Sequence, residues 1–172
     1  RLPFLFLIVI YGIIISPVLA QKTPSPTAVL LSDSLRFVTA SSFNQSAVAY
    51  HPGYNKYYSL RAGNPSFPLE TWNATGGLSV FQTTAGIDSR GMWYNPNTNQ
   101  LERNCYSNLG WTTVNLDVGG NALNTYSILF PGQNQPNVQS VGAYDYKTNT
   151  VLFYSGAGVV AVYNRNTATQ TG

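Results

Sequence analysis

Residues 91–101 have the sequence Gly91-Met92-Trp93-Tyr94-Asn95-Pro96-Asn97-Thr98-Asn99-Gln100-Leu101, which predicts a short strand ending in aromatic residues, a polar turn and a second strand. Two similar segments are Ala47-Val48-Ala49-Tyr50-His51-Pro52-Gly53-Tyr54-Asn55-Lys56-Tyr57-Tyr58 and Val141-Gly142-Ala143-Tyr144-Asp145-Tyr146-Lys147-Thr148-Asn149-Thr150-Val151-Leu152. Gly and Asn tolerate positive φ and Pro presets a bend, so the middle of each segment suits a turn. A hairpin that recurs three times predicts a repeat architecture.

Short strands are predicted along the whole chain after residue 28. They cover 47–50, 56–60, 69–72 and 78–82 in a first repeat (about 46–88), 91–94, 101–106, 111–116 and 126–130 in a second (about 89–139), and 141–144, 150–155 and 159–163 in a third (140–172). A fourth strand of the third repeat is absent or only begins within 167–171, and strands at 28–31 and 35–38 precede the repeats. Helices are disfavoured because Gly and Pro interrupt every window and apolar residues alternate or occur in short runs.

Repeats of 40–50 residues with four strands each are typical of β-propeller blades. The aromatic residues Tyr50, Trp93 and Tyr144 are 43 and 51 residues apart. The turns Tyr94-Asn95-Pro96-Asn97-Thr98-Asn99 and Tyr144-Asp145-Tyr146-Lys147-Thr148-Asn149 resemble the Y-D-x-x-T-G/N hairpin of secreted β-propellers with kelch-, YVTN- and quinoprotein-like blades.

This resemblance implies an all-β fold of four-stranded antiparallel blades. Closed propellers have at least four blades and this chain has about three, so we expect an incomplete propeller whose remaining blades belong to a longer chain. The strand at 35–38 could complete a blade with strands near the C-terminus. A β-sandwich or an open β-meander built from the same hairpins is the alternative.

The first 20 residues predict a secretory signal peptide, with Arg1 before a nearly continuous apolar run and cleavage between Ala20 and Gln21. The apolar run is shorter than the roughly 20 residues that cross a bilayer, so we expect no stable membrane anchor in the mature chain. Residues 21–27 predict a flexible leader and 28–172 the β-repeat domain. The expected location is extracellular, or periplasmic or on the cell surface in a bacterium.

The composition narrows the class of partner. Charged residues make up 9% of the chain and are scattered, so no basic face for nucleic acid is predicted. Cys105 is the single cysteine, which excludes an internal disulfide. We expect it to be buried in the strand at 101–106, with pairing to another chain as the alternative.

The titratable residues suggest no catalytic group by their spacing. His51 is the only histidine, and it is either an exposed turn residue or a base or metal ligand on a loop rim. Asp88 and Arg90 lie between repeats, where they form a local ion pair or contribute to a binding site. No motif for a metal, a phosphate or a dinucleotide is present, so neither a metal nor a cofactor is expected.

Aromatic residues are the most abundant candidates for binding. Aligned copies place Tyr50, Trp93 and Tyr144 at one packed position, followed by the rim positions His51, Tyr94 and Asp145. We expect any ligand to be bound where the copies differ. Trp72 and Trp111 are further candidates for stacking on a sugar or a protein partner. Asn44 and Asn73 begin N-glycosylation sequons, which matter if the source is eukaryotic.

Export, repeated hairpins and abundant aromatic residues predict a non-catalytic binding or scaffold module that recognises a protein or a glycan. The alternative is a propeller enzyme, either a lyase or hydrolase acting on extracellular polysaccharide or a quinoprotein-like oxidoreductase. Fold alone does not choose between them.

Overall fold

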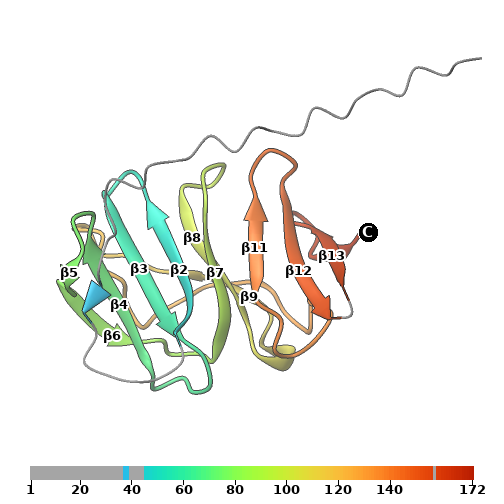
Figure 1. Cartoon of the computed structure of the whole chain (residues 1–172), viewed down its shortest axis with the longest axis horizontal. Helices are drawn as coiled ribbons and strands as arrows, with labels where there is room; N and C mark the ends of the chain where they lie inside the picture. Colours follow the sequence, from blue (N-terminus) through green and yellow to red (C-terminus); the bar gives the residue numbers. More distant parts are fainter. Residues whose placement is uncertain (1–36, 39–44, 157) are drawn as a thin grey trace, which may run out of the picture. The chain divides into compact units, whose positions relative to one another are not determined.

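The computed structural model describes residues 37–38, 45–156 and 158–172. These residues belong to one compact unit, Ser34–Gly172. The predictions for the signal peptide, its cleavage at Ala20 and Gln21, the leader and Asn44 fall outside the described residues. β-Strands are the main regular structure of the described residues, and they form three four-stranded antiparallel sheets (Figure 1). The prediction of an all-β fold with four-stranded antiparallel sheets is therefore confirmed, and each of these three sheets is called a blade.

The first blade is a meander in the order β2-β3-β4-β6. Its strands are β2 (Gln45–His51), β3 (Lys56–Arg61), β4 (Pro68–Asn73) and β6 (Phe81–Thr84). The strand predicted at 78–82 is divided, because β5 (Gly77–Leu78) pairs in parallel with β1 (Phe37–Val38) while β6 pairs with β4. The N-terminal strand therefore lies beside the first repeat, and the expected pairing with C-terminal strands was wrong.

The second blade has the order β10-β9-β8-β7 and the third the order β11-β12-β13-β14. The strands of the second are β7 (Ser89–Asn95), β8 (Gln100–Cys105), β9 (Trp111–Val114) and β10 (Ile128–Phe130), with the short 3₁₀ turn η1 (Ser107–Leu109) between β8 and β9. Those of the third are β11 (Gly142–Asp145), β12 (Thr150–Gly156), β13 (Val159–Asn164) and β14 (Thr169–Gln170). Strands β9 and β10 are shorter than predicted because residues 115–127 form a loop, closed by a bridge between Leu116 and Ala122. The predicted weak fourth strand of the last repeat is β14.

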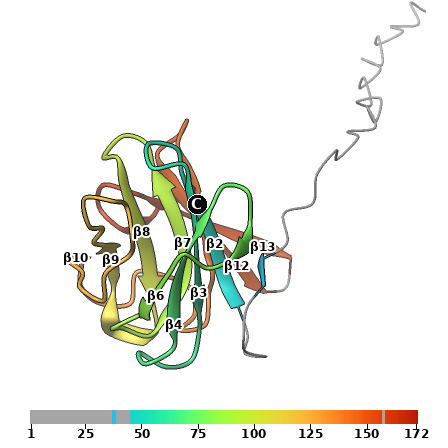
Figure 2. The same cartoon turned by 90° about the vertical axis from the view of Figure 1, so that its left-hand side faces the viewer.

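The three blades stand side by side with their first strands innermost. Strand β7 lies against β2 on one side and against β11 on the other, and Figure 2 views this row from the side of the first blade. At Gly91 the strands β7 and β11 approach each other so closely that a β-carbon would lie 2.5 Å from the backbone nitrogen of Gly142. The same β-carbon would lie 2.4 Å from the Asn104 side chain. No strand ladder joins one described blade to another, so side-chain packing and polar contacts hold the blades together.

Strand alternation gives each blade two faces, and the blades bury these faces against one another. One core lies between the first and second blades, with Tyr58, Leu60 and Leu69 packed near Met92 and Leu101. A second core lies between the second and third blades and is rich in aromatic residues. Its main members are Trp93, Trp111, Val151, Phe153 and Tyr163.

Polar contacts reinforce the first junction. The loop after β9 reaches back to the first blade, where Tyr58 donates its hydroxyl hydrogen to the Gly120 carbonyl (2.6 Å) and Lys56 Nζ donates to the Gly119 carbonyl (2.8 Å). The backbone N–H of Ala122 donates to the Thr71 hydroxyl (3.1 Å). This loop therefore fixes the second blade on the first.

A buried ion pair joins the second and third blades. The Glu102 side chain is fully buried, and Arg165 donates to both of its oxygens from Nε (2.5 Å) and Nη2 (2.6 Å). The same carboxylate accepts hydrogen bonds from Trp93 Nε1 (3.0 Å), Asn95 Nδ2 (2.8 Å) and Thr98 Oγ1 (3.2 Å). A buried charge with this many donors is well compensated.

Replacement of Arg165 by Leu should destabilise the protein by about 3–5 kcal/mol, because it leaves the Glu102 carboxylate buried without its cation. Urea denaturation followed by tryptophan fluorescence measures the change. The double variant Glu102→Leu/Arg165→Leu should recover much of the loss, since no unpaired charge remains, and Lys147→Met at an exposed turn is the surface control. A loss below about 1 kcal/mol for Arg165→Leu would contradict the role of the ion pair.

Candidate functional site

The first two strands of each blade form an inner hairpin (β2–β3, β7–β8 and β11–β12). The turn of each inner hairpin contains the same kind of side-chain hydrogen bond. In each, the tyrosine next to the end of the inner strand donates its hydroxyl hydrogen to the side-chain oxygen of an asparagine five residues later. The pairs are Tyr50–Asn55 (2.7 Å), Tyr94–Asn99 (2.8 Å) and Tyr144–Asn149 (2.8 Å). The three asparagines have φ of 52°, 55° and 53°, a left-handed conformation that asparagine tolerates better than most residues. This tyrosine–asparagine clamp therefore fixes the shape of each turn.

The clamp corrects the alignment of the repeats by one residue. Strand register pairs Tyr94 with Leu101 just as it pairs Tyr50 with Tyr57 and Tyr144 with Val151. Tyr94, and not Trp93, is therefore the counterpart of Tyr50 and Tyr144. By the same register, His51 corresponds to Asn95 and Asp145.

A fourth copy of this turn joins β13 to β14 and was missed in the sequence. It comprises Tyr163-Asn164-Arg165-Asn166-Thr167-Ala168, with Ala168 at φ 53°. The Asn164 side chain accepts a hydrogen bond from the Asn166 backbone (2.8 Å), as Asn95 does from Asn97 (3.0 Å). The sequence signal for this turn is the pattern Tyr-Asn-x-x-Thr, which it shares with the turn of the second hairpin. This turn positions Arg165 beside Glu102.

His51 is the last residue of β2 and is 1% exposed, so the expectation of an exposed turn residue was wrong. Its ring lies between Tyr54 and Tyr94, with ring centroids 4.8 Å and 4.6 Å away. Nε2 lies 3.4 Å from the Asn99 carbonyl oxygen, and Nδ1 has no hydrogen-bond partner in the described part of the chain. Burial lowers the pKa of His51, so its ring is neutral near pH 7.

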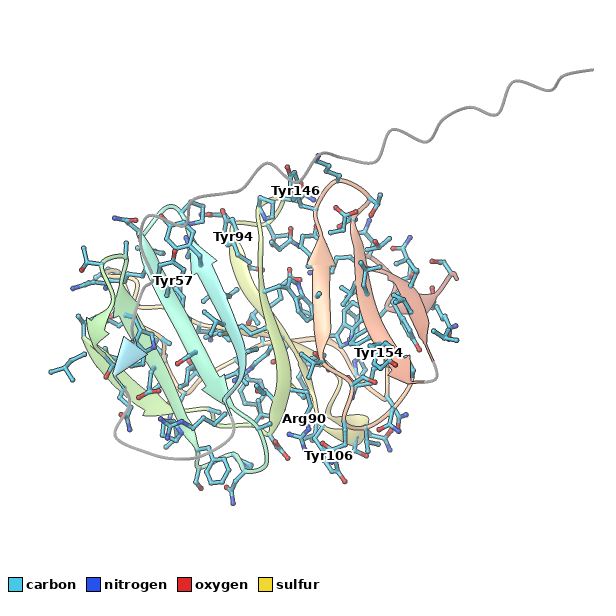
Figure 3. All side chains as sticks on the ribbon, viewed as in Figure 1. Tyr57, Arg90, Tyr94, Tyr106, Tyr146 and Tyr154 are labelled. Carbon is cyan, nitrogen blue, oxygen red and sulfur yellow. The ribbon has the colours of Figure 1, made fainter. Side chains whose placement is uncertain are left out.

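Tyr94 also borders an aromatic cleft between the second and third blades, at the end seen uppermost in Figure 3. The cleft has a volume of about 400 Å³ and is lined by Tyr94, Pro96, Asn97, Tyr144 and Tyr146. The Tyr146 side chain is 57% exposed. Asn97 Nδ2 donates to the Tyr144 hydroxyl oxygen (3.1 Å), so the two turns that form the cleft are bonded to each other.

A second cavity, of about 430 Å³, lies at the junction of the first and second blades. His51 and Tyr54 of the first hairpin line it together with Asn99 and Gln100 of the second. Further lining comes from β9 and the loop that follows, including Asn115. Its walls combine neutral polar side chains with aliphatic ones, such as Leu116 and Leu123.

Asp145 has a local structural role in the third hairpin and lines neither cavity. Its carboxylate accepts hydrogen bonds from the Thr148 hydroxyl (2.8 Å) and the Lys147 backbone (2.9 Å). These bonds, led by that of Thr148, lower the pKa of Asp145. The residue therefore stabilises the turn that presents Tyr146.

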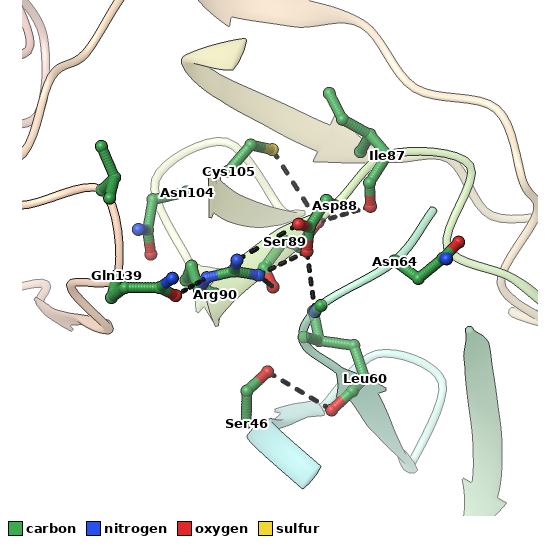
Figure 4. Close-up of polar contacts among 12 residues, drawn as sticks. Ser46, Leu60, Asn64, Ile87, Asp88, Ser89, Arg90, Asn104, Cys105 and Gln139 are labelled. Carbon is green, nitrogen blue, oxygen red and sulfur yellow. Dashed lines mark hydrogen bonds and ion pairs between the residues drawn. The ribbon is translucent and has the colours of Figure 1, made fainter. Parts of the chain in front are cut away.

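Arg90 lies at the opposite end of the blades from Tyr94 and Tyr146 (Figure 3), and Asp88 is its partner there. They form an ion pair in which Arg90 Nη2 is 3.1 Å from Asp88 Oδ2, as the structural alternative predicted (Figure 4). Arg90 Nε also donates to Gln139 Oε1 (2.6 Å), and its guanidinium lies 4.6 Å from the centre of the Tyr106 ring. Asp88 accepts a hydrogen bond from the Gly63 backbone (2.9 Å). The pair therefore connects the first repeat to the second, including the end of the segment that leads into the third blade.

The two tryptophan candidates are fully buried and are not brought to either cavity. Trp72 Nε1 donates to Ser59 Oγ (2.9 Å), and Trp111 Nε1 donates to the Asn134 carbonyl (3.0 Å). Neither ring is available for stacking on a ligand. Asn73 is exposed at the end of β4, and its glycosylation stays a prediction.

Cys105 is buried, as expected, and lies 3.7 Å from the Thr112 hydroxyl. Burial raises the pKa of its thiol, which disfavours a reactive thiolate. Within residues 37–38, 45–156 and 158–172, no group of His, Cys, Asp and Glu side chains could hold a metal ion. In the same residues, no helix has the length and apolar character to cross a membrane.

The chain matches no family model and no curated protein sequence. Among solved structures it is similar to the computationally designed Ika4 protein, with a TM-score of 0.43 and 12% sequence identity over 81% of this chain and 78% of that chain. A likeness at this level says nothing about function, which has to be inferred from the chain's own residues.

The buried His51 should make stability depend on pH. Its pKa is lower in the folded protein than the 6.5 of a free side chain, so the unfolded chain takes up a proton first as the pH falls. The free energy of unfolding should therefore fall more steeply between about pH 7 and pH 5 in the wild type than in His51→Gln, and urea titrations at several pH values compare the two. Parallel pH profiles would show that burial of His51 has no such effect.

Proposed function

We propose that this protein is a secreted, non-catalytic binding module that recognises a glycan at the aromatic cleft between its second and third blades. The observation that carries the proposal is the cleft itself, which tyrosine rings, a proline and an asparagine line together. Small-ligand sites are typically concave, largely apolar and supplied with a few polar groups that orient the ligand. A sugar ring suits this combination, since its C–H face can lie on an aromatic ring while its hydroxyls bond to amides.

The clamped turns support binding without large rearrangement. Tyr94 and Tyr144 are each tied to an asparagine of their own turn, and Asn97 ties the second turn to the third. The aromatic walls are therefore held in place before a ligand arrives. Such preorganisation lowers the entropic cost of binding.

The state of the acidic residues supports a non-catalytic role. Among the described residues, every carboxylate is engaged in a structural contact: Glu70 with Arg61, Asp88 with Arg90, Glu102 with Arg165, Asp117 with Asn121, and Asp145 with Thr148. A glycosidase needs two carboxylates that face each other across the bound sugar. The described residues place no such pair at the cleft.

A glycan array, followed by calorimetry on the tightest-binding glycan, tests the proposal. Tyr146→Ala should weaken binding about tenfold, because one aromatic contact contributes roughly 1–1.5 kcal/mol. The matched control is Tyr154→Ala on β12, which removes a tyrosine that is 65% exposed but does not line the cleft. Absence of binding to any glycan, or equal losses in the two variants, would contradict the proposal.

We also propose that a further blade of a longer chain covers the outer face of the third blade. Strand alternation places Leu152, Tyr154, Val160 and Val162 on the side opposite the aromatic core, and Tyr154 and Val160 are 65% and 50% exposed. The corresponding face of the second blade is buried by the third. Exposed apolar faces of this kind mark sites of association.

If this face lacks its neighbour, the isolated chain should self-associate as its concentration rises, and Val160→Lys should reduce the association. Light scattering over a concentration series measures both. A wild-type chain that stays monomeric up to a concentration of about 100 µM would contradict the proposal, because specific protein–protein complexes typically have dissociation constants well below this value.

A further inference from the structure

We infer that the cleft and the cavity are two parts of one elongated site, and that its ligand is a linear, uncharged oligosaccharide long enough to contact both. The inference rests on the proposed function and extends it from a single cleft to a surface that crosses the three hairpins. It specifies the length and the charge of the ligand.

Side chains that line one hollow are in contact with side chains that line the other. Tyr94 lines the cleft and His51 lines the cavity, and their rings are 4.6 Å apart. Asn99 also belongs to both neighbourhoods, since its side chain accepts the Tyr94 hydroxyl and its carbonyl oxygen lies 3.4 Å from His51 Nε2. The two hollows therefore adjoin at the contact between Tyr94 and His51.

Each hollow offers an aromatic ring beside neutral hydrogen-bonding groups. The cleft has Tyr146 next to Asn97. The cavity has Tyr54, which is 38% exposed, together with Gln100 and Asn115. The same combination at two places suits a polymer of similar units better than it suits two unrelated ligands.

The lining indicates an uncharged ligand. No Asp, Glu, Lys or Arg side chain lines either hollow. His51 is neutral near pH 7 because burial lowers its pKa. Lys56 lies on the same hairpin as Tyr54, but its Nζ donates to the Gly119 carbonyl (2.8 Å) and to Asn121 Oδ1 (2.9 Å). A uronic acid or a sulfated sugar would bury its charge here without a partner, which is costly.

The volumes indicate a ligand of several units. The hollows measure about 400 and 430 Å³, each near the lower end of the range of roughly 300–1,000 Å³ that is typical of small-ligand pockets. Each therefore suits a short part of a chain. Two such sites occupied by one linear molecule bind more tightly than either alone, because the second contact is intramolecular.

Calorimetry with neutral glucose, mannose and xylose oligomers of two to eight units tests this inference. We expect the affinity for at least one series to rise tenfold or more from the dimer to the longer members and then level off. Tyr54→Ala and Gln100→Ala in the cavity should each lower the ratio of long-chain to dimer affinity, and Tyr154→Ala should leave that ratio unchanged. Thermal melting shows whether Tyr54→Ala is folded, and Gln100→Ala at an exposed position provides the second readout.

An affinity that does not depend on oligomer length would overturn the elongated site and leave the proposed single cleft intact. The same holds if the cavity variants keep the wild-type ratio of long-chain to dimer affinity. Tighter binding of acidic oligomers than of neutral ones of equal length would overturn the inference that the ligand is uncharged. Failure of every oligomer and every arrayed glycan to bind would instead overturn the proposed function itself.

Discussion

The arrangement of the second and third blades depends on the buried ion pair between Glu102 and Arg165. The Glu102 carboxylate is fully buried and is bonded to Arg165 of the third blade and to Trp93, Asn95 and Thr98 of its own. A carboxylate costs several kcal/mol to bury unless its oxygens are satisfied. The position of the β13–β14 turn is therefore constrained by the second blade's requirement for a cation.

The same network extends to the cleft. Asn95 donates to Glu102 through Nδ2 (2.8 Å), and its Oδ1 shares the Tyr144 hydroxyl hydrogen with Asn149 Oδ1, at 3.2 Å and 2.8 Å from the hydroxyl oxygen. Tyr144 in turn forms one wall of the cleft and accepts a hydrogen bond from Asn97. Asn95 and Tyr144 thus link the interior ion pair to the cleft. The geometry of the cleft therefore depends on the packing of the second blade against the third as well as on the hairpin turns.

Much of the fold could be predicted because its determinants are local. Alternating apolar residues and turns with Asn, Pro and Gly indicated the hairpins, and most strands lie within two residues of their predicted positions. The alignment of repeats failed by one residue because Trp93 and Tyr94 are adjacent aromatic residues on opposite faces of β7. Glu102 and Arg165 could not be paired from the sequence, since they are 63 residues apart and their contact arises only when blades pack.

The turns of the inner hairpins combine a structural role with the ligand-binding role that we propose for them. Their first and last residues are shared among the inner hairpins, where tyrosine bonds to asparagine and fixes the backbone. The residues between them differ, and they supply Tyr54 to the cavity, and Asn97 and Tyr146 to the cleft. Because the clamp holds the backbone, these middle positions can change without loss of the turn. The proposed binding of a glycan therefore uses positions where the copies diverge, while the positions they share maintain the blade.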